Sequence, residues 1–185
     1  MKLKKYIIVS VIAIVIVLGG INIYNSRNHN AVLQRWNLQD LDITELVLVM
    51  DQTTYDLTQI NAGINGKELI ITDEVGEYRF ALPNDLFYLS FAPYISETHP
   101  CANHNLVTCR GELPNQTFDV TITTLDGTVI VNETLTSFDN GFIGIWLEKD
   151  IEATIDVQLN GLVASSYIST FETSDTCLTT PLQLQ

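Results

Sequence analysis

The hydrophobic pattern separates the first 27 residues from the rest of the chain. Residues 6–24 form an almost uninterrupted apolar stretch, which as a helix would measure about 28 Å, close to the hydrocarbon thickness of a bilayer. The stretch also suits the apolar part of a signal peptide, although no A-x-A-like cleavage step follows it. Three lysines precede it and Arg27 follows it, a distribution that places the remainder outside the cytoplasm. We therefore predict a signal anchor or signal peptide over residues 1–27, with the uncleaved anchor favoured.

Beyond this segment the pattern is first helical and then changes to a period of two. Residues 28–57 are predicted to be helical, with Thr44 as the N-cap of a helix whose apolar face lies in residues 45–50. After residue 57 alternating apolar and polar residues predict strands. The expected strands are 67–72, 76–82, 85–91, 117–124, 128–135, 142–147, 153–159 and 162–170.

The turns between these strands indicate the fold class. Asp126-Gly127 and Asn160-Gly161 each separate two predicted strands and are typical of tight hairpins. Strands joined in this way favour a β-sandwich-like arrangement over alternating strands and helices. We expect an α+β fold that is mainly β, with a small α/β domain over residues 28–85 and a β-rich domain over residues 86–185.

The charged residues are distributed unevenly between residues 1–27 and the rest of the chain. The chain carries 22 acidic and nine basic residues, and four of the basic residues but none of the acidic ones lie in residues 1–27. The remainder therefore has 22 acidic residues against five basic ones. A surface this acidic repels phosphate, so we expect no binding to nucleic acid.

The residues with the most distinctive chemistry lie between positions 99 and 109. This stretch contains His99, Cys101, His104 and Cys109, and the third cysteine, Cys177, is close to the C-terminus. Thiolates and imidazole are ligands that Cu(I) and Zn(II) prefer. Outside the cytoplasm thiols meet oxidising conditions, and an odd number of cysteines leaves at least one outside an internal disulfide. The residues therefore indicate a metal site, a disulfide, or both.

The residues alone leave two interpretations of this cluster open. In the first, Cys101 and Cys109 form a structural disulfide, worth about 2.5 kcal/mol in the chain-entropy model, and the histidines are ordinary loop residues. In the second, the cluster is a metal or redox site. A reducible disulfide beside a third thiol would combine the two. The chain has no phosphate loop, nucleophile elbow or HExxH motif that would indicate another chemistry.

Four short segments carry a family resemblance. Their sequences, in chain order, are FYLSFAPY, THPCANHNLVTCRGEL, NGFIGIWL and DTCLTTPLQL. Together they resemble the CueP family of extracytoplasmic copper-binding proteins, which has two cysteines close together and one near the C-terminus. Cys101, Cys109 and Cys177 match those positions, and the resemblance is dense from residue 82 onward and weak over residues 28–81. It implies a two-domain subunit that can dimerise, a β-rich C-terminal metal domain and a role in copper resistance.

Combined with the resemblance, the residues yield one hypothesis about function. Cys101, Cys109 and Cys177 would meet at one site in the periplasm or cell envelope, with His104 and His99 completing it. Because thiolates reduce Cu(II) and then hold Cu(I), copper capture could be coupled to disulfide formation. The expected ligand is copper, and zinc suits the same residues.

The hypothesis also implies partners and alternatives. We expect a copper-accepting protein, a thiol reductase, a second copy of the chain, and the membrane through the N-terminal segment. Stoichiometric reduction of Cu(II) is not turnover unless a partner re-reduces the cysteines, so a binding protein is expected rather than an enzyme. The competing interpretations are a membrane-anchored β-rich interaction module with a structural disulfide and a structural zinc-binding protein.

Overall fold

The computed structural model describes residues 29–52 and 59–185, and the predicted signal segment at 1–27 lies outside these described residues. Of these, residues 42–52 and 59–185 form one compact unit, whereas residues 29–41 belong to a separate unit in which residues 29–35 are helical. No helix within the described ranges is long and apolar enough to cross a membrane.

Helix α2 (Ile43–Gln52) begins at a capping box. Asp42 Oδ1 accepts hydrogen bonds from the backbone N–H groups of Thr44 at 2.8 Å and Glu45 at 2.9 Å, and Glu45 Oε2 accepts one from the Asp42 N–H at 3.2 Å. The predicted N-cap, Thr44, is therefore wrong, because the carboxylate two residues earlier satisfies the free N–H groups of the first turn. The buried face of the helix comprises Leu46, Val47, Met50 and Asp51, so it includes one carboxylate.

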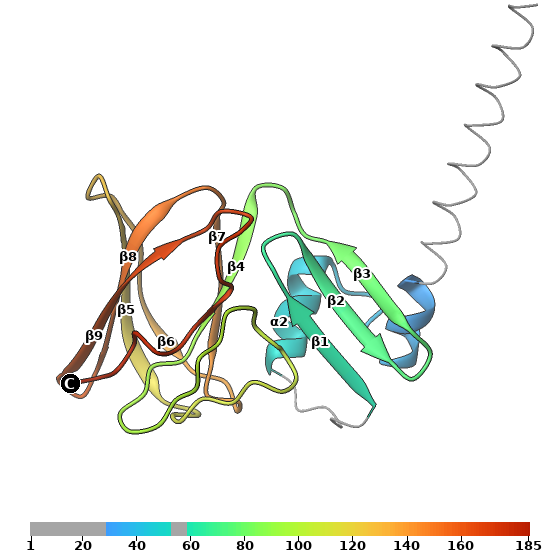
Figure 1. The fold of residues 1–185 in the computed structure, drawn as a ribbon, viewed down its shortest axis with the longest axis horizontal. Helices are drawn as coiled ribbons and strands as arrows, with labels where there is room; N and C mark the ends of the chain where they lie inside the picture. The colour runs from blue at the N-terminus through green and yellow to red at the C-terminus, as the bar shows by residue number, and fades with distance from the viewer. Residues whose placement is uncertain (1–28, 53–58) are drawn as a thin grey trace, which may run out of the picture. The chain divides into compact units, whose positions relative to one another are not determined.

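A small antiparallel sheet follows, with its strands in the order β1-β2-β3 (Figure 1). The strands are β1 (Ile60–Ile64), β2 (Glu68–Asp73) and β3 (Glu77–Ala81). Asn65 Oδ1 stabilises the first turn by accepting hydrogen bonds from two backbone N–H groups, and Asp73 Oδ1 does the same in the second. The pattern did not predict β1, because Asn61 and Gly63 both have low strand propensity.

Two further sheets make up the β-rich part of the unit (Figure 1). One has the order β10-β4-β7, in which β10 is parallel to β4, and the other has the order β6-β5-β8-β9 and is antiparallel throughout. The strands are β4 (Leu86–Phe91), β5 (Thr117–Thr124), β6 (Val129–Thr136), β7 (Ile143–Glu148), β8 (Glu152–Leu159), β9 (Leu162–Ser169) and β10 (Cys177–Leu178). The α+β, mainly β fold is confirmed.

Strand β4 lies between β10 and β7 in its sheet and is buried on both faces. Successive side chains of a strand point to opposite sides. Phe87, Leu89 and Phe91 belong to the large apolar cluster that β4 shares with β5, β7 and β8. Tyr88 and Ser90 have the opposite orientation and contact Asp51 of α2 instead. One strand therefore links the main core to the buried carboxylate of the helix.

Candidate metal centre

Four donor side chains from distant parts of the chain meet at one point. The ligand atoms of Cys101, His104, Cys109 and Cys177 all lie within 4.8 Å of one another. The first three come from the loop between β4 and β5, and Cys177 comes from β10, where it is paired in register with Ser90 of β4. His104 and Cys177 are buried, at 0% and 2% exposure. Parallel pairing of β10 with β4 is thus what returns the third cysteine to the loop.

The loop that carries the donors is held by backbone contacts on two sides. On one side, the Ile64 N–H donates to the His104 carbonyl at 2.9 Å, and the Leu106 N–H donates to the Ala62 carbonyl at 2.8 Å, so the loop is bonded to β1. On the other side, the His104 N–H donates to Thr176 Oγ1 at 3.0 Å, next to Cys177. These bonds fix the position of His104 between the small sheet and β10.

A tight turn places Cys109 against the same point. Asn105 Oδ1 accepts hydrogen bonds from the backbone N–H groups of Val107 at 3.1 Å and Thr108 at 2.9 Å. The Asn105 N–H in turn donates to Cys109 Sγ at 3.4 Å. A backbone donor directed at a sulfur atom favours the thiolate over the thiol.

The disulfide joins Cys101 to Cys177, whose Cα atoms are 5.5 Å apart and which are separated by 76 positions in sequence. The Cys101–Cys109 pairing considered from the sequence is therefore wrong for this state: those two sulfur atoms are 3.8 Å apart, and Cys109 is a free cysteine. The reason is a long-range one, since the β10–β4 pairing brings Cys177 against Cys101. Cys109 Sγ nevertheless lies close to both bonded sulfur atoms.

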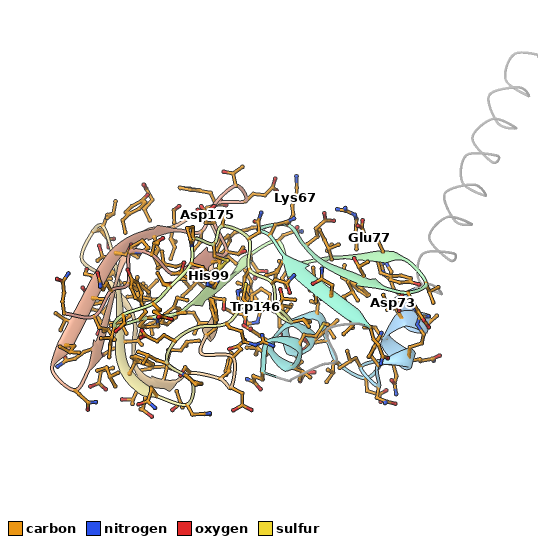
Figure 2. The ribbon with its side chains drawn as sticks, turned by 60° about the horizontal axis from the view of Figure 1, so that its bottom comes forward. Lys67, Asp73, Glu77, His99, Trp146 and Asp175 are labelled. Carbon is orange, nitrogen blue, oxygen red and sulfur yellow. A yellow bond between two sulfur atoms is a disulfide. The ribbon has the colours of Figure 1, made fainter. Side chains whose placement is uncertain are left out.

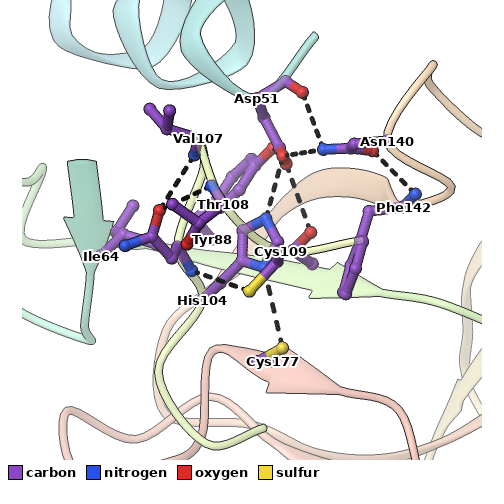
Figure 3. A network of polar contacts seen from close by, with 12 residues as sticks. Asp51, Ile64, Tyr88, His104, Val107, Thr108, Cys109, Asn140, Phe142 and Cys177 are labelled. Carbon is purple, nitrogen blue, oxygen red and sulfur yellow. Dashed lines mark hydrogen bonds and ion pairs between the residues drawn. The ribbon is translucent and has the colours of Figure 1, made fainter. Parts of the chain in front are cut away.

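The imidazole of His104 is fixed at both nitrogen atoms and at its face (Figure 3). Nε2 is 2.9 Å from Asp51 Oδ1, and Nδ1 is 3.7 Å from Cys177 Sγ. The ring also packs against Phe142, with 4.6 Å between the ring centroids. The nitrogen that faces the sulfur atoms is therefore Nδ1.

Asp51 is the residue of this centre that the sequence analysis did not identify. Its Oδ2 accepts hydrogen bonds from Tyr88 Oη at 2.7 Å and Ser90 Oγ at 3.2 Å, and its Oδ1 accepts one from Asn140 Nδ2 at 2.9 Å (Figure 3). The signal in the sequence is an acidic residue placed where helical spacing from Val47 predicts an apolar one. Buried carboxylates are rare unless they are paired, and this one has four polar side-chain partners, including His104.

These contacts change the acidity of the buried groups. Burial lowers the pKa of His104, but the Asp51 carboxylate and the Cys109 thiolate outweigh this effect and raise that pKa to about 9. Burial raises the pKa of Cys109, but the hydrogen bond and charge of His104, together with the Asn105 N–H, outweigh it, and the pKa is lowered. The imidazolium form of His104 and the thiolate form of Cys109 therefore stabilise each other. Burial and the Asp51 carboxylate raise the pKa of Tyr88, which keeps the phenol protonated.

His99, the fifth residue expected at the site, is not in the group of four donors. Its backbone carbonyl accepts a hydrogen bond from Thr179 Oγ1 at 2.6 Å. His99 lines a separate open pocket of about 290 Å³ together with Glu97, Arg110 and Glu112. Figure 2 shows where His99 lies among the side chains.

The arrangement has two chemical states with different numbers of donors. With the disulfide formed, the Cys109 thiolate and His104 Nδ1 are the available donors among the four residues. Reduction would add two thiolates, giving three sulfur atoms and one nitrogen. A Cys₃His set is a known tetrahedral zinc arrangement, and soft thiolates equally select Cu(I).

Comparisons with known proteins identify the family of the chain. The family model described as periplasmic copper-binding protein CueP matches residues 45–183, a range that contains the four donors and Asp51. A crystal structure of S.CueP is 42% identical in sequence, covers 85% of this chain and 97% of its own, and has a TM-score of 0.81. A comparison with curated proteins found no match. The resemblance inferred from the sequence is confirmed, and the chain belongs to the CueP family of periplasmic copper-binding proteins.

Proposed function

We propose that this protein binds copper outside the cytoplasm and contributes to copper resistance or homeostasis. In the reduced state Cys101, Cys109, Cys177 and His104 hold Cu(I). The observation that carries the proposal is the convergence of these four donor atoms within 4.8 Å of one another. Family membership supports copper as the metal, since the family description names copper.

The cysteines can also supply the electrons that turn Cu(II) into Cu(I). The thiolates of Cys101 and Cys177 each lose one electron, two Cu(II) ions are reduced to two Cu(I) ions, and the S–S bond forms. Cys109 is left as a thiolate that can still bind Cu(I) together with His104. The disulfide of this structure corresponds to the product of that step. A thiol reductase outside the cytoplasm must then re-reduce the disulfide before another two Cu(II) ions can react.

The fate of the metal follows from the same chemistry. Bound Cu(I) is sequestered from radical-forming reactions or passed to a copper-accepting protein with a comparable thiolate site. Cys101 is partly exposed, which gives such a partner an approach to the group of donors. We further propose that the protein acts on the extracytoplasmic side of the cell membrane, anchored or secreted, and that it can form a homodimer.

A titration with Cu(I) against a competing chelator tests the proposal. We expect the reduced wild type to bind tightly, each single Cys→Ser variant to lose affinity, and the triple variant to lose binding. His99→Gln is the matched control, because it removes an imidazole of the same loop that lies outside the group of four donors. Unchanged affinity in the triple variant would refute the proposed site.

Experiments on the reduced wild-type protein distinguish copper reduction from the two alternative functions, a structural zinc site and an interaction module. Reduced protein given Cu(II) should lose two thiols for every two Cu(I) ions formed. A structural zinc site, which the Cys₃His donors also suit, would instead be recovered with Zn(II) bound when the protein is purified from copper-grown cells. An interaction module with a structural disulfide would bind neither metal and keep a constant thiol content.

A further inference from the structure

One buried group has no part in the chemistry proposed above, namely the carboxylate of Asp51. Its side chain is 0% exposed and lies in the last turn of helix α2, in sequence 50 positions before Cys101. A carboxylate so deeply buried costs free energy unless its contacts compensate for the lost water. One of those contacts is with the proposed metal ligand His104, on the side of its ring opposite the sulfur atoms, and this contact indicates what the carboxylate does.

The contact with His104 determines which nitrogen atom faces the sulfurs. An ionised carboxylate only accepts hydrogen bonds, so the imidazole nitrogen 2.9 Å from Asp51 Oδ1, Nε2, must carry a proton. Nδ1, which is 3.7 Å from Cys177 Sγ, is then the nitrogen available to a metal ion. Carboxylate–histidine–metal arrangements of this kind orient the ring and strengthen the ligand.

The carboxylate is itself held in place from three sides. Tyr88 and Ser90 on β4 donate to Oδ2, and Asn140 Nδ2 donates to both Oδ1 and the Asp51 backbone carbonyl, at 2.9 Å each. Gly144 on β7 leaves the space for this arrangement, since a Cβ atom there would lie 1.7 Å from Tyr88 Oη and 2.9 Å from Asp51 Oδ2. A carboxylate with this many partners cannot rotate away from the imidazole.

We propose that Asp51 is a positioning residue that presents Nδ1 of His104 to the metal. The inference rests on the proposed copper site and adds to it a group that touches no metal itself. Binding of Cu(I) at Nδ1 would release to solvent the proton that an imidazolium carries there, while the proton on Nε2 would stay shared with Asp51. Helix α2 thereby becomes part of the copper site through a single side chain.

The test measures Cu(I) affinity in Asp51→Asn, with bicinchoninate as the competing chelator. Loss of an outer-shell carboxylate typically weakens metal binding 10- to 100-fold, and we expect a loss in that range. Asp156→Asn is the matched control, because it removes the same charge from an exposed position on β8, and its affinity should equal that of the wild type. In a His104→Gln background, the Asp51→Asn change should cost less than about threefold, since the residue through which it acts is gone. An equal loss in both backgrounds would overturn the proposal.

A measurement on the unaltered protein keeps the proposal falsifiable if Asp51→Asn fails to fold. Nitrogen-15 NMR of the His104 ring should show Nε2 protonated both before and after Cu(I) is added, and Nδ1 bound to the metal afterwards. Metal on Nε2, or a proton retained on Nδ1 in the loaded protein, would overturn the role of Asp51. A wild type that binds no Cu(I) would overturn the proposed function as well, so the two failures are distinguishable.

Discussion

Replacing Gly144 by alanine tests the packing that holds Tyr88 against Asp51. The new methyl group would lie 1.7 Å from Tyr88 Oη and 2.5 Å from Tyr88 Cζ, far inside contact distance, so the phenol must move. Moving it breaks a buried hydrogen bond to a charged group, worth about 1.5–3 kcal/mol, and overpacking of a filled core adds about 1–3 kcal/mol. We therefore expect Gly144→Ala to lower the free energy of unfolding by about 2.5–6 kcal/mol.

Urea denaturation followed by tryptophan fluorescence measures this loss, and Trp146 is well placed as a reporter because its ring centroid is 5.0 Å from that of Tyr88. Gly63→Ala is the matched control: this strand glycine has no atom within 4 Å of the added Cβ and has no positive φ, so the variant should be as stable as the wild type or more stable by up to about 1 kcal/mol. The disulfide must be intact in all samples. Equal midpoints for Gly144→Ala and the wild type would refute the reasoning, because they would mean that no hydroxyl occupies that space.

Three further predictions concern the same centre. Tyr88→Phe removes one buried hydrogen bond to Asp51 without adding volume, so it should lower the free energy of unfolding by about 1.5–3 kcal/mol, less than Gly144→Ala does. Reducing the Cys101–Cys177 disulfide, whose cysteines are 76 positions apart, should lower stability by about 4.5 kcal/mol in the chain-entropy model, measured by denaturation with and without reductant in the absence of metal. Because its pKa is lowered from 9.0, the Cys109 thiol should be half-converted to the reactive thiolate at a pH below 9.0, as measured by alkylation rate in the oxidised protein. His104→Gln should move that midpoint upward, and an unchanged midpoint would contradict the imidazole–thiolate pair.

The sequence predicts those parts of the fold whose signal is local. Strand β5 was predicted with its observed bounds, because its alternating residues TFDVTITT have one face in the core and the other toward solvent. Asn-Gly and Asp-Gly turns marked the hairpins for a similar reason. Strand β1 and the two-residue strand β10 were missed, since both depend on pairing with strands elsewhere in the chain and have little pattern of their own.

The site could be predicted only in part, for the same physical reason. The short spacing of Cys101, His104 and Cys109 marked the loop, and the family resemblance added Cys177. Which cysteines pair depends on the parallel β10–β4 contact, which no local pattern encodes. Asp51 was missed because its partners come from β4, the donor loop and the segment before β7, up to 89 positions away. An isolated carboxylate on an apolar helix face was the one clue available.

X-ray absorption spectroscopy at the copper edge tests the central claim most directly. Reduced protein loaded with one equivalent of Cu(I) should show copper coordinated by sulfur from the three cysteines together with one imidazole nitrogen. After the Cys101–Cys177 disulfide is formed, one thiolate sulfur should remain, because Cys109 is then the free cysteine. Copper coordinated only by oxygen or nitrogen, or a sulfur contribution that does not change with oxidation, would contradict the account.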